Sequence, residues 1–535
     1  PQYLEFELAP ILEDDFYAEY AVLWKILHVS RIRNSAEGID LDIWEEWRKE
    51  SINTGERVRE RLRVGVSKAI RLFGTGFLRH KENSVLFEHL QNSSLTTEEY
   101  YHQILRLVYR FLFISVTEER YSEKGIRLIF DPTSTVEARN NYEKGYSLFR
   151  LKKEMRSSRS KNLNYHDKWE AQKIVFKALE DGNTLLGLPS LGGLFGAELC
   201  NELLDLKLSN FYFLSALESL RWAEDKEERP FWVDYRNLGT QELGSVYESL
   251  LEMIPVIDTD KKEFRFIDDN DEETTAGNER KTTGSYYTPD FLVQQLIKTA
   301  VVPVVEKTLE KSNNPEGDLL SLSIVDPSCG SGHFLIAAAS TIAVYLSRYR
   351  ENGETVSGYR QAYRDVISHC IYGVDLNPMA VELTKMALWL EGYEPGKPLS
   401  FLDSHVKCGN SLLGILEPKV LKDGIPNDAF EPQENDDKKL CNELKKNNTK
   451  YRKFLQSHPM RDNALYDETL VSESMQIDSM PEDTAEDVER KKQLYKAHAE
   501  EADNSSANKA ANLFLATFFI KKDDVSRIPT SGLLQ

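Results

Sequence analysis

The spacing of apolar residues changes along the chain and divides it into regions. Up to residue 238, apolar positions recur at helical intervals, which predicts a mainly helical amino-terminal domain over 1–238. Thr96 followed by Glu98 and Glu99 marks one helix start within it. The apolar face of that helix is formed by Ile104, Leu107, Val108, Phe111 and Leu112.

Residues 239–281 have the pattern of a helix followed by a polar connector. Ser245 and Glu248 have the spacing of a capping box and precede a short apolar run. The stretch Asp258–Lys281 is acidic and polar, a composition that favours a mobile connector over a packed element. This part is therefore predicted to link two domains.

Short apolar strands alternate with helices over residues 282–416. This alternation predicts an α/β fold in which a parallel sheet forms a Rossmann-like core. Residues 417–535 are polar again, which predicts an insertion of helices and loops, although its segment 510–520 is apolar.

Bulk composition is that of a soluble globular protein. With 535 residues, 41% hydrophobic and 29% charged, the chain is long enough for about three domains. Its longest apolar stretch, Phe334–Leu346, is interrupted by Ser340 and Thr341, which predicts a buried helix and not a membrane span. No signal peptide opens the chain, and the first residue, Pro1, indicates a piece of a longer protein.

The five cysteines are scattered and form no C-x-x-C pair. This pattern predicts reduced thiols, no metal site, and a cytoplasmic location.

Charge is segregated along a chain whose formal net charge is −20. One basic run interrupts the acidic background, and it could follow a nucleic-acid backbone or simply form a solvated surface. It consists of Arg150, Lys152, Lys153, Arg156, Arg159 and Lys161.

A strand, a Gly-rich turn and a helix follow one another after residue 320. The strand is predicted from Leu320, Leu322, Ile324 and Val325. The string Asp326-Pro-Ser-Cys-Gly330-Ser-Gly332 then turns sharply into an Ala-rich helix. Such glycines let the backbone approach a ligand beside a helix amino terminus, although a plain turn is the alternative.

The ligand of this turn is constrained by two residues. Leu335 stands where a dinucleotide-binding Gly-x-Gly-x-x-Gly turn needs its third glycine, which argues against a dehydrogenase. Asp326, at the strand end, suits a cationic group such as the sulfonium or ammonium of S-adenosylmethionine.

A second strand ends in an acid within Ile371-Tyr-Gly-Val-Asp375-Leu-Asn377-Pro378. An acid at this position of a doubly wound sheet accepts hydrogen bonds from ribose hydroxyls, so Asp375 is a candidate ribose ligand. The alternative is that Asp375 caps the following helix, and both roles are compatible.

Two further strings carry candidate polar groups. Thr288 is predicted to cap a helix that has Pro289 at its first position, and the free amides of that helix could hold a carboxylate. Asn410 follows a third predicted strand and could bind the edge of an adenine ring, with Asp403 at the start of that strand as a secondary candidate. His405 and Cys408 are assigned structural roles.

Together these strings resemble the methyltransferases that modify adenine N6 in DNA, in particular the type IIG restriction–modification and phage-defence proteins. The resemblance covers Gly284–Leu412 and rests on Gly-x-x-Tyr-Thr-Pro, Asp-Pro-x-Cys-Gly-Ser-Gly-x-Phe-Leu, Gly-Val-Asp and Gly-Asn-Ser-Leu. It implies S-adenosylmethionine as cofactor, double-stranded DNA as substrate, and restriction or defence-system subunits as possible partners. It implies cofactor contacts at Tyr287, Thr288, Pro289, Asp326, Ser328, Gly330, Gly332, Phe334, Asp375, Leu376 and Asn410.

The chain departs from that family in one respect. The catalytic tetrapeptide, Asn or Asp followed by Pro-Pro and an aromatic residue, grips the flipped-out adenine, but no Pro-Pro occurs in this sequence. We therefore expect the chain to stop before the motif and to bind cofactor without a complete active site. Two alternatives remain open: a protein or RNA amine methyltransferase, and a non-catalytic DNA- or partner-binding module.

Overall fold

The structure is a computed structural model, and part of the chain is described here. The described residues are 24, 28, 33–35, 38–40, 62–122, 125–196, 199–224, 230–233, 235–236, 253–267, 288–350, 356–415, 417, 419–434, 436–457, 468–523 and 528–531. The predicted capping box at Ser245 and Glu248, and the residues Gly284–Tyr287, lie outside them.

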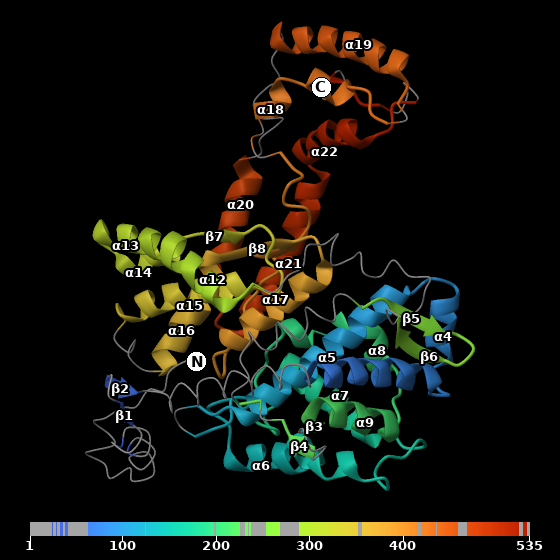
Figure 1. The fold of residues 1–535 in the computed structure, drawn as a ribbon, viewed down its shortest axis with the longest axis vertical. Coiled ribbons are helices and arrows are strands. Elements are labelled where there is room, and N and C mark those ends of the chain that lie inside the picture. Colours follow the sequence, from blue (N-terminus) through green and yellow to red (C-terminus); the bar gives the residue numbers. More distant parts are fainter. Residues whose placement is uncertain are drawn as a thin grey trace.

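The amino-terminal part is mainly helical, as predicted (Figure 1). Residues 62–79 are helical. The helices that follow are α4 (Ser84–Gln91), α5 (Thr97–Glu119), α6 (Val136–Gly145), α7 (Asp167–Asp181), α8 (Asn201–Asp205) and α9 (Asn210–Arg221), with 3-10 turns η2 (Phe149–Lys152), η3 (Glu154–Arg156) and η4 (Gly193–Phe195). Short antiparallel pairs are formed by β1 (Arg33–Ser35) with β2 (Gly38–Asp40), and by β3 (Trp222–Glu224) with β4 (Pro230–Trp232).

Helix α5 is the centre of this part. Thr96 caps it, and a capping box forms because the Glu99 carboxylate accepts the Thr96 amide hydrogen at 2.9 Å. All five residues of the predicted apolar face are fully buried. The helix start and its core-facing side are therefore confirmed.

The predicted connector after Asp258 is wrong in its first part. Strands β5 (Pro255–Asp258) and β6 (Glu263–Phe266) form an antiparallel hairpin. Phe264 and Phe266 are buried and pack around Tyr101 of α5, with the Phe264 and Tyr101 ring centroids 6.1 Å apart. These two aromatic side chains stabilise the hairpin, although the surrounding sequence is polar.

A three-stranded parallel sheet forms the α/β part, in the order β7 (Ile324–Asp326), β8 (Ile371–Asp375), β9 (Val406–Cys408). Ile324 pairs with Ile371, and Gly373 pairs with Val406. The helices of this part are α12 (Asp290–Leu296), the π-helical turn η7 (Ile297–Val301), α13 (Val302–Glu310), α14 (Pro315–Leu320), α15 (His333–Ser347), α16 (Val356–Cys370) and α17 (Pro378–Glu391). The predicted α/β class is confirmed.

Two strand predictions need correction. The first strand begins at Ile324, because Asn314 caps a short helix that starts at Pro315 and includes Leu320. Val325 is 61% exposed and not buried. The third strand begins at Val406, since the apolar pair at 401–402 is buried in the loop that leads to it.

Helix α15 is buried along one side, as its sequence predicted, and α16 follows it before the second strand. The Tyr363 hydroxyl of α16 donates to the Ile336 carbonyl of α15 at 3.0 Å, which joins the two helices. Among the described residues, no helix combines the length and apolarity that crossing a bilayer requires.

The last part of the chain divides into two groups of helices. Helices α18 (Lys419–Lys422), α19 (Lys438–Ser457) and α22 (Ser506–Phe519), with the turn η8 (Asn427–Phe430), form a small separate core around Phe430 and Phe514 (Figure 1). Helices α20 (Glu468–Asp478) and α21 (Ala485–Asn504) pack on each other and reach back towards the sheet.

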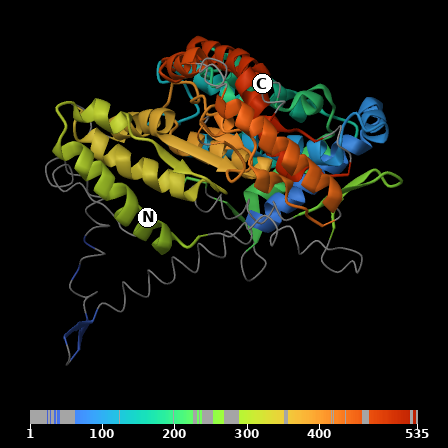
Figure 2. The ribbon, with the colours of Figure 1, turned by 90° about the horizontal axis from the view of Figure 1, so that it is seen from above.

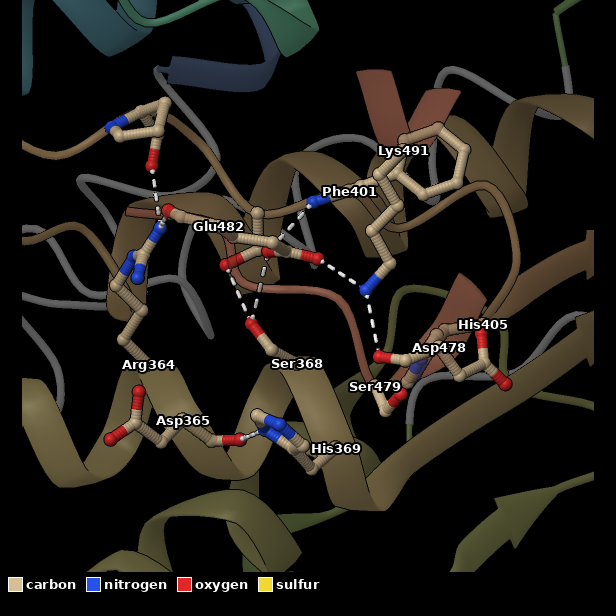
Figure 3. Close-up of polar contacts among 12 residues, drawn as sticks. Arg364, Asp365, Ser368, His369, Phe401, His405, Asp478, Ser479, Glu482 and Lys491 are labelled. Carbon is tan, nitrogen blue, oxygen red and sulfur yellow. Dashed lines mark hydrogen bonds and ion pairs between the residues drawn. The ribbon is translucent and has the colours of Figure 1, made fainter. Parts of the chain in front are cut away.

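A buried ion pair anchors α20 and α21 to the α/β part (Figure 3). The Lys491 ammonium lies 2.8 Å from the Glu482 carboxylate, whose other oxygen accepts hydrogen bonds from the Phe401 amide and the Ser368 hydroxyl. Arg364 donates to the Glu482 carbonyl at 2.6 Å. The predicted insertion is thus partly integrated into the α/β part.

The helical amino-terminal part packs directly on α17. Arg106 of α5 pairs with Glu382 of α17 at 3.4 Å, and the Phe113 ring meets the Tyr393 ring edge-on at 5.5 Å. Figure 2 shows α12 to α16 gathered on one side of the molecule and the blue amino-terminal helices on the other. The amino-terminal part therefore supports the helix that follows the second strand.

Candidate cofactor site

Three loops meet at the carboxyl edge of the parallel sheet. The Gly330 amide donates to the Asp375 carboxylate at 2.9 Å, and the neighbouring Cys329 amide donates to the Val374 carbonyl at 2.9 Å. The Gly409 amide donates to the Asp375 carbonyl at 2.9 Å. The Gly-rich turn, the acid of the second strand and the Gly-Asn turn therefore lie together, as their strand-end positions predicted.

The bend at Gly332 has a steric cause. Its φ of 81° is left-handed, and it stands at the amino terminus of α15. A Cβ added there would lie 3.0 Å from Thr384 Cγ2. Thr384 also donates from its hydroxyl to the Gly330 carbonyl at 2.7 Å, so α17 holds the turn in place.

The glycine of Gly-Val-Asp is required by packing. A Cβ on Gly373 would lie 2.9 Å from Leu335 Cδ1 and 3.1 Å from Cys329 Sγ. Leu335, which replaces the third glycine of a dinucleotide turn, thus packs over the second strand. Burial raises the pKa of the Cys329 thiol to about 12, which fits a structural role for that side chain.

Asp375 is held by the backbone and does not cap α17. One carboxylate oxygen accepts the Gly330 amide hydrogen and the other accepts the Asn377 amide hydrogen at 2.8 Å. Asn377 is the capping residue, since its side chain accepts the Met379 amide hydrogen at 2.8 Å. Each carboxylate oxygen of Asp375 keeps acceptor capacity for a ligand hydroxyl.

Asp326 adds a second negative charge to the same edge. Burial raises the pKa of Asp326, the Ser328 amide hydrogen bond opposes this, and the nearby Asp375 charge raises the pKa further. Within the described part of the chain neither carboxylate forms an ion pair. Two adjacent carboxylates without a cation suit a positively charged ligand.

The Thr-Pro string reaches the Gly-rich turn from α12. The helix begins at Asp290 with Pro289 as the capping position, one residue later than predicted, so Thr288 is not the cap. The Asp290 carboxylate lies 3.6 Å from His333 Nε2, at the first residue of α15. This contact brings Thr288 and Pro289 to the turn that contains Gly332.

The remaining candidates at this edge are surface residues. Leu376 is 60% exposed although it is a large apolar side chain, while Ser328 is exposed and Phe334 is half-buried. Asn410 is exposed, and its side-chain oxygen accepts the Leu412 amide hydrogen at 2.9 Å. An exposed Leu376 beside Asp375 offers an apolar surface to a ring.

Asp403 does not join this group. It precedes β9, at the amino edge of a parallel sheet whose carboxyl edge ends at Asp375 and Cys408. Its carboxylate pairs with Lys385 of α17, and it lines a cavity of about 720 Å³ that contains neither Asp375 nor Gly330. The secondary cofactor role considered for Asp403 therefore has no geometric support.

Several side chains of the predicted basic run form ion pairs or ring contacts within the amino-terminal part. Lys161 pairs with Glu218, Arg150 pairs with Glu154, and Lys152 Nζ lies 4.6 Å from the Trp232 ring centroid. Arg156 stacks on Trp222 at 4.9 Å. Lys153 and Arg159 are exposed. Four of the six side chains thus have partners within the amino-terminal part, and nucleic-acid binding by the run stays a prediction.

Sequence reasoning missed the residues that fix the turn from outside. Thr384 lies in the middle of α17, where its spacing carries no signal, and the Asp290–His333 contact joins residues from two motifs. Asp290 and His333 belong to strings that the sequence singled out, but neither string indicated that these two side chains lie close together.

Comparison with known proteins identifies the α/β part. Residues 273–413 match the family model for N-6 DNA methylase, and residues 369–510 match that for the Eco57I restriction-modification methylase. These matches confirm the resemblance of this part of the chain to N6 DNA methyltransferases of the restriction–modification type. The second match continues through α20 and α21, which agrees with their anchoring on the sheet.

Individual relatives match a limited part of the chain. A type II restriction enzyme and methyltransferase of Methanocaldococcus jannaschii is 26% identical over 33% of this chain and 17% of that protein. The adenine-specific methyltransferase PglX of Streptomyces coelicolor is 30% identical over 20% of this chain and 8% of its own length. The chain thus matches less than a fifth of either relative.

A solved structure was also found, that of the type IIL restriction-modification enzyme MmeI in complex with DNA. It is 17% identical, covers 66% of this chain and 42% of that one, and has a TM-score of 0.37.

Proposed function

We propose that this chain is the cofactor-binding part of a DNA methyltransferase that transfers a methyl group from S-adenosylmethionine to adenine N6 in a restriction–modification or phage-defence system. The observation that carries the proposal is the hydrogen bond from the Gly330 amide to Asp375, which joins the two cofactor motifs at one sheet edge. We also propose that the core of the α/β part is Rossmann-like.

The residues present fit S-adenosylmethionine. Asp375 has acceptor capacity for the ribose hydroxyls, and Asp326 would offer a negative charge to the sulfonium and ammonium groups. Gly330 and Gly332 leave the backbone free of side chains on the approach to α15. The exposed Leu376 suits contact with the flat face of the adenine ring. The Asn410 amide suits hydrogen bonding to the edge of that ring.

When bound, S-adenosylmethionine supplies the methyl group for transfer. The residues of this chain would hold and orient it: the Thr288–Pro289 segment and the start of α12 would bind the methionine carboxylate, and Thr384 keeps the turn closed. No Pro-Pro occurs in the sequence, so none of its residues is proposed to grip the target adenine. We expect the chain alone to bind cofactor and not to methylate.

The test is methylation by the full-length protein with double-stranded DNA of varied sequence, read as N6-methyladenine by mass spectrometry. N6-methyladenine that disappears in Asp375→Ala supports the proposal. Methyl transfer to protein or RNA but never to DNA would establish the second enzymatic reading instead. A chain that shows no S-adenosylmethionine binding by calorimetry would favour a non-catalytic binding module.

A further inference from the structure

Two histidines and a glutamate meet in the amino-terminal part, far from the cofactor site. His80 and Glu82 lie in the turn after the helix at 62–79, and His166 precedes α7. One ligand atom from each of the three side chains lies within 4.8 Å of the other two. The His80 and His166 ring centroids are 5.7 Å apart, and the rings are nearly perpendicular.

We propose that His80, Glu82 and His166 bind a Zn²⁺ ion that ties the turn to α7. Two imidazole nitrogens and one carboxylate oxygen form a donor set that Zn²⁺ prefers, and three protein ligands leave one coordination position for water. Around a tetrahedral ion with bonds of about 2.0 Å, donor atoms lie roughly 3.3 Å apart. Small side-chain rotations would bring the three groups from their present spacing to that distance.

His166 provides an independent reason to expect a ligand. Its Nδ1 is buried, and it has no hydrogen-bond partner in the described part of the chain. His166 occupies the capping position of α7, yet its side chain makes no capping hydrogen bond. A buried nitrogen without a partner costs free energy, and a bound ion is one way to satisfy it.

The turn that carries His80 and Glu82 is held firmly. Buried Asn83 donates to the Phe77 carbonyl at 2.9 Å and to the Lys207 carbonyl at 2.8 Å, and its side-chain oxygen accepts the Lys207 amide hydrogen. The Glu82 amide lies 3.3 Å from His80 Nδ1, so the turn folds back on the ring. This weak hydrogen bond is the one contact of the turn that an ion at Nδ1 would replace.

The segment that carries His166 is equally fixed. Asn210 of α9 donates from its amide to the Tyr165 carbonyl at 2.7 Å and from its side chain to the Asp167 carboxylate at 2.8 Å. Beneath both ligand segments, the fully buried rings of Phe77 and Trp169 meet edge-on at 5.5 Å. Both ligand segments are therefore supported by buried, well-packed side chains, which limits the reorganisation that metal binding requires.

No sequence motif indicated this site, and the cysteine pattern predicted that the chain has no metal site. The site contains no cysteine, so cysteine spacing could not indicate it. His166 is also distant in the sequence from His80 and Glu82, and the packing of α7 on the helix at 62–79 brings the three ligands together.

Zn²⁺ binding to the metal-stripped chain tests the proposal, by equilibrium dialysis with elemental analysis and by the thermal unfolding midpoint. We expect a single Zn²⁺ per chain, a midpoint raised by several degrees, and at least a tenfold loss of affinity in His80→Ala and in His166→Ala. Glu82→Gln should lose part of the affinity. The matched control is His89→Ala, because His89 lies 3.5 Å from the Glu202 carboxylate and belongs to no three-ligand cluster among the described residues.

Co²⁺ gives a second readout, since visible absorption bands typical of four-coordinate Co²⁺ should form in the wild type and disappear in His166→Ala. If an alanine variant unfolds, the same measurements are made on His80→Gln and His166→Gln, whose side chains are closer in size to histidine. Wild type that takes up no Zn²⁺, or Zn²⁺ held equally by wild type and both histidine variants, overturns the proposal. Neither result affects the cofactor site, because the assay contains no S-adenosylmethionine.

Discussion

The Gly330 amide and the Asp375 carboxylate are hydrogen-bonded at 2.9 Å, although they belong to different strand–helix units. The bond closes the Gly-rich turn onto the end of the neighbouring strand. It makes Asp375 both a support for the turn and a candidate ligand, so changes at either residue should affect the same cleft.

Asp375→Ala should weaken S-adenosylmethionine binding about 10- to 150-fold, since hydrogen bonds to a charged group contribute about 1.5–3 kcal/mol. Calorimetry on the purified chain measures this. Asp403→Ala is the matched control, because Asp403 lies at the opposite edge of the sheet and pairs with Lys385. Equal losses in the two variants would refute the assignment of the carboxyl edge.

Gly332→Ala should destabilise the chain by about 1–2 kcal/mol, because an L-residue is strained at a φ of 81° and its Cβ would press on Thr384. Gly409→Ala, where a Cβ meets nothing within 4 Å, should change stability by less than about 0.5 kcal/mol. Denaturant unfolding compares the two. A Gly332 variant as stable as the Gly409 variant would contradict the steric account.

Cofactor binding should weaken in acid because of Asp326. Its pKa is raised above the ordinary value of 3.8, mainly by burial, so protonation begins at a higher pH and removes the charge that faces the cation. Titration calorimetry from neutral pH downwards should show this loss of affinity. Asp326→Asn should bind more weakly at neutral pH and lack the acid-dependent loss.

The raised pKa of Asp326 affects folding stability in the opposite direction: stability should rise, not fall, as the pH is lowered. A carboxyl whose folded pKa is raised costs stability while it is ionised, and this cost is relieved as the pH falls through the folded pKa. Asp326→Asn should therefore be at least as stable as wild type at neutral pH. A clearly less stable variant would mean that Asp326 supports the fold more than the ligand.

Lys491→Ala should release α20 and α21 from the sheet. It leaves the buried Glu482 carboxylate without its cation, and breaking such a pair costs about 3–5 kcal/mol. Hydrogen exchange should rise across 468–504. Lys397→Ala breaks a more exposed pair with Asp483 nearby and should leave exchange there almost unchanged, and similar profiles for the two variants would argue against the anchor.

The candidate cofactor edge could be predicted from sequence because its determinants are local. Gly332, Asp326 and Asp375 each mark a strand end or a turn through their own backbone chemistry, and parallel strands place such ends together. The polar stretch after Asp258 hid a hairpin, since Phe264 and Phe266 are stabilised by α5, which is distant in sequence.

Other features depended on competition between local signals. Leu320 and Leu322 continue the apolar spacing of a strand, yet Asn314 and Pro315 start a helix before it. Basic residues such as Lys152 and Lys161 have the composition of a nucleic-acid surface, but tertiary partners decide whether their charges face solvent.

A crystal structure of the chain with S-adenosylmethionine tests the central claim most directly. The account predicts the ribose hydroxyls within hydrogen-bonding distance of Asp375 and the methionine part between the Gly330–Gly332 turn and the start of α12. Cofactor bound at any other place, such as the cavity beside Asp403, would contradict it.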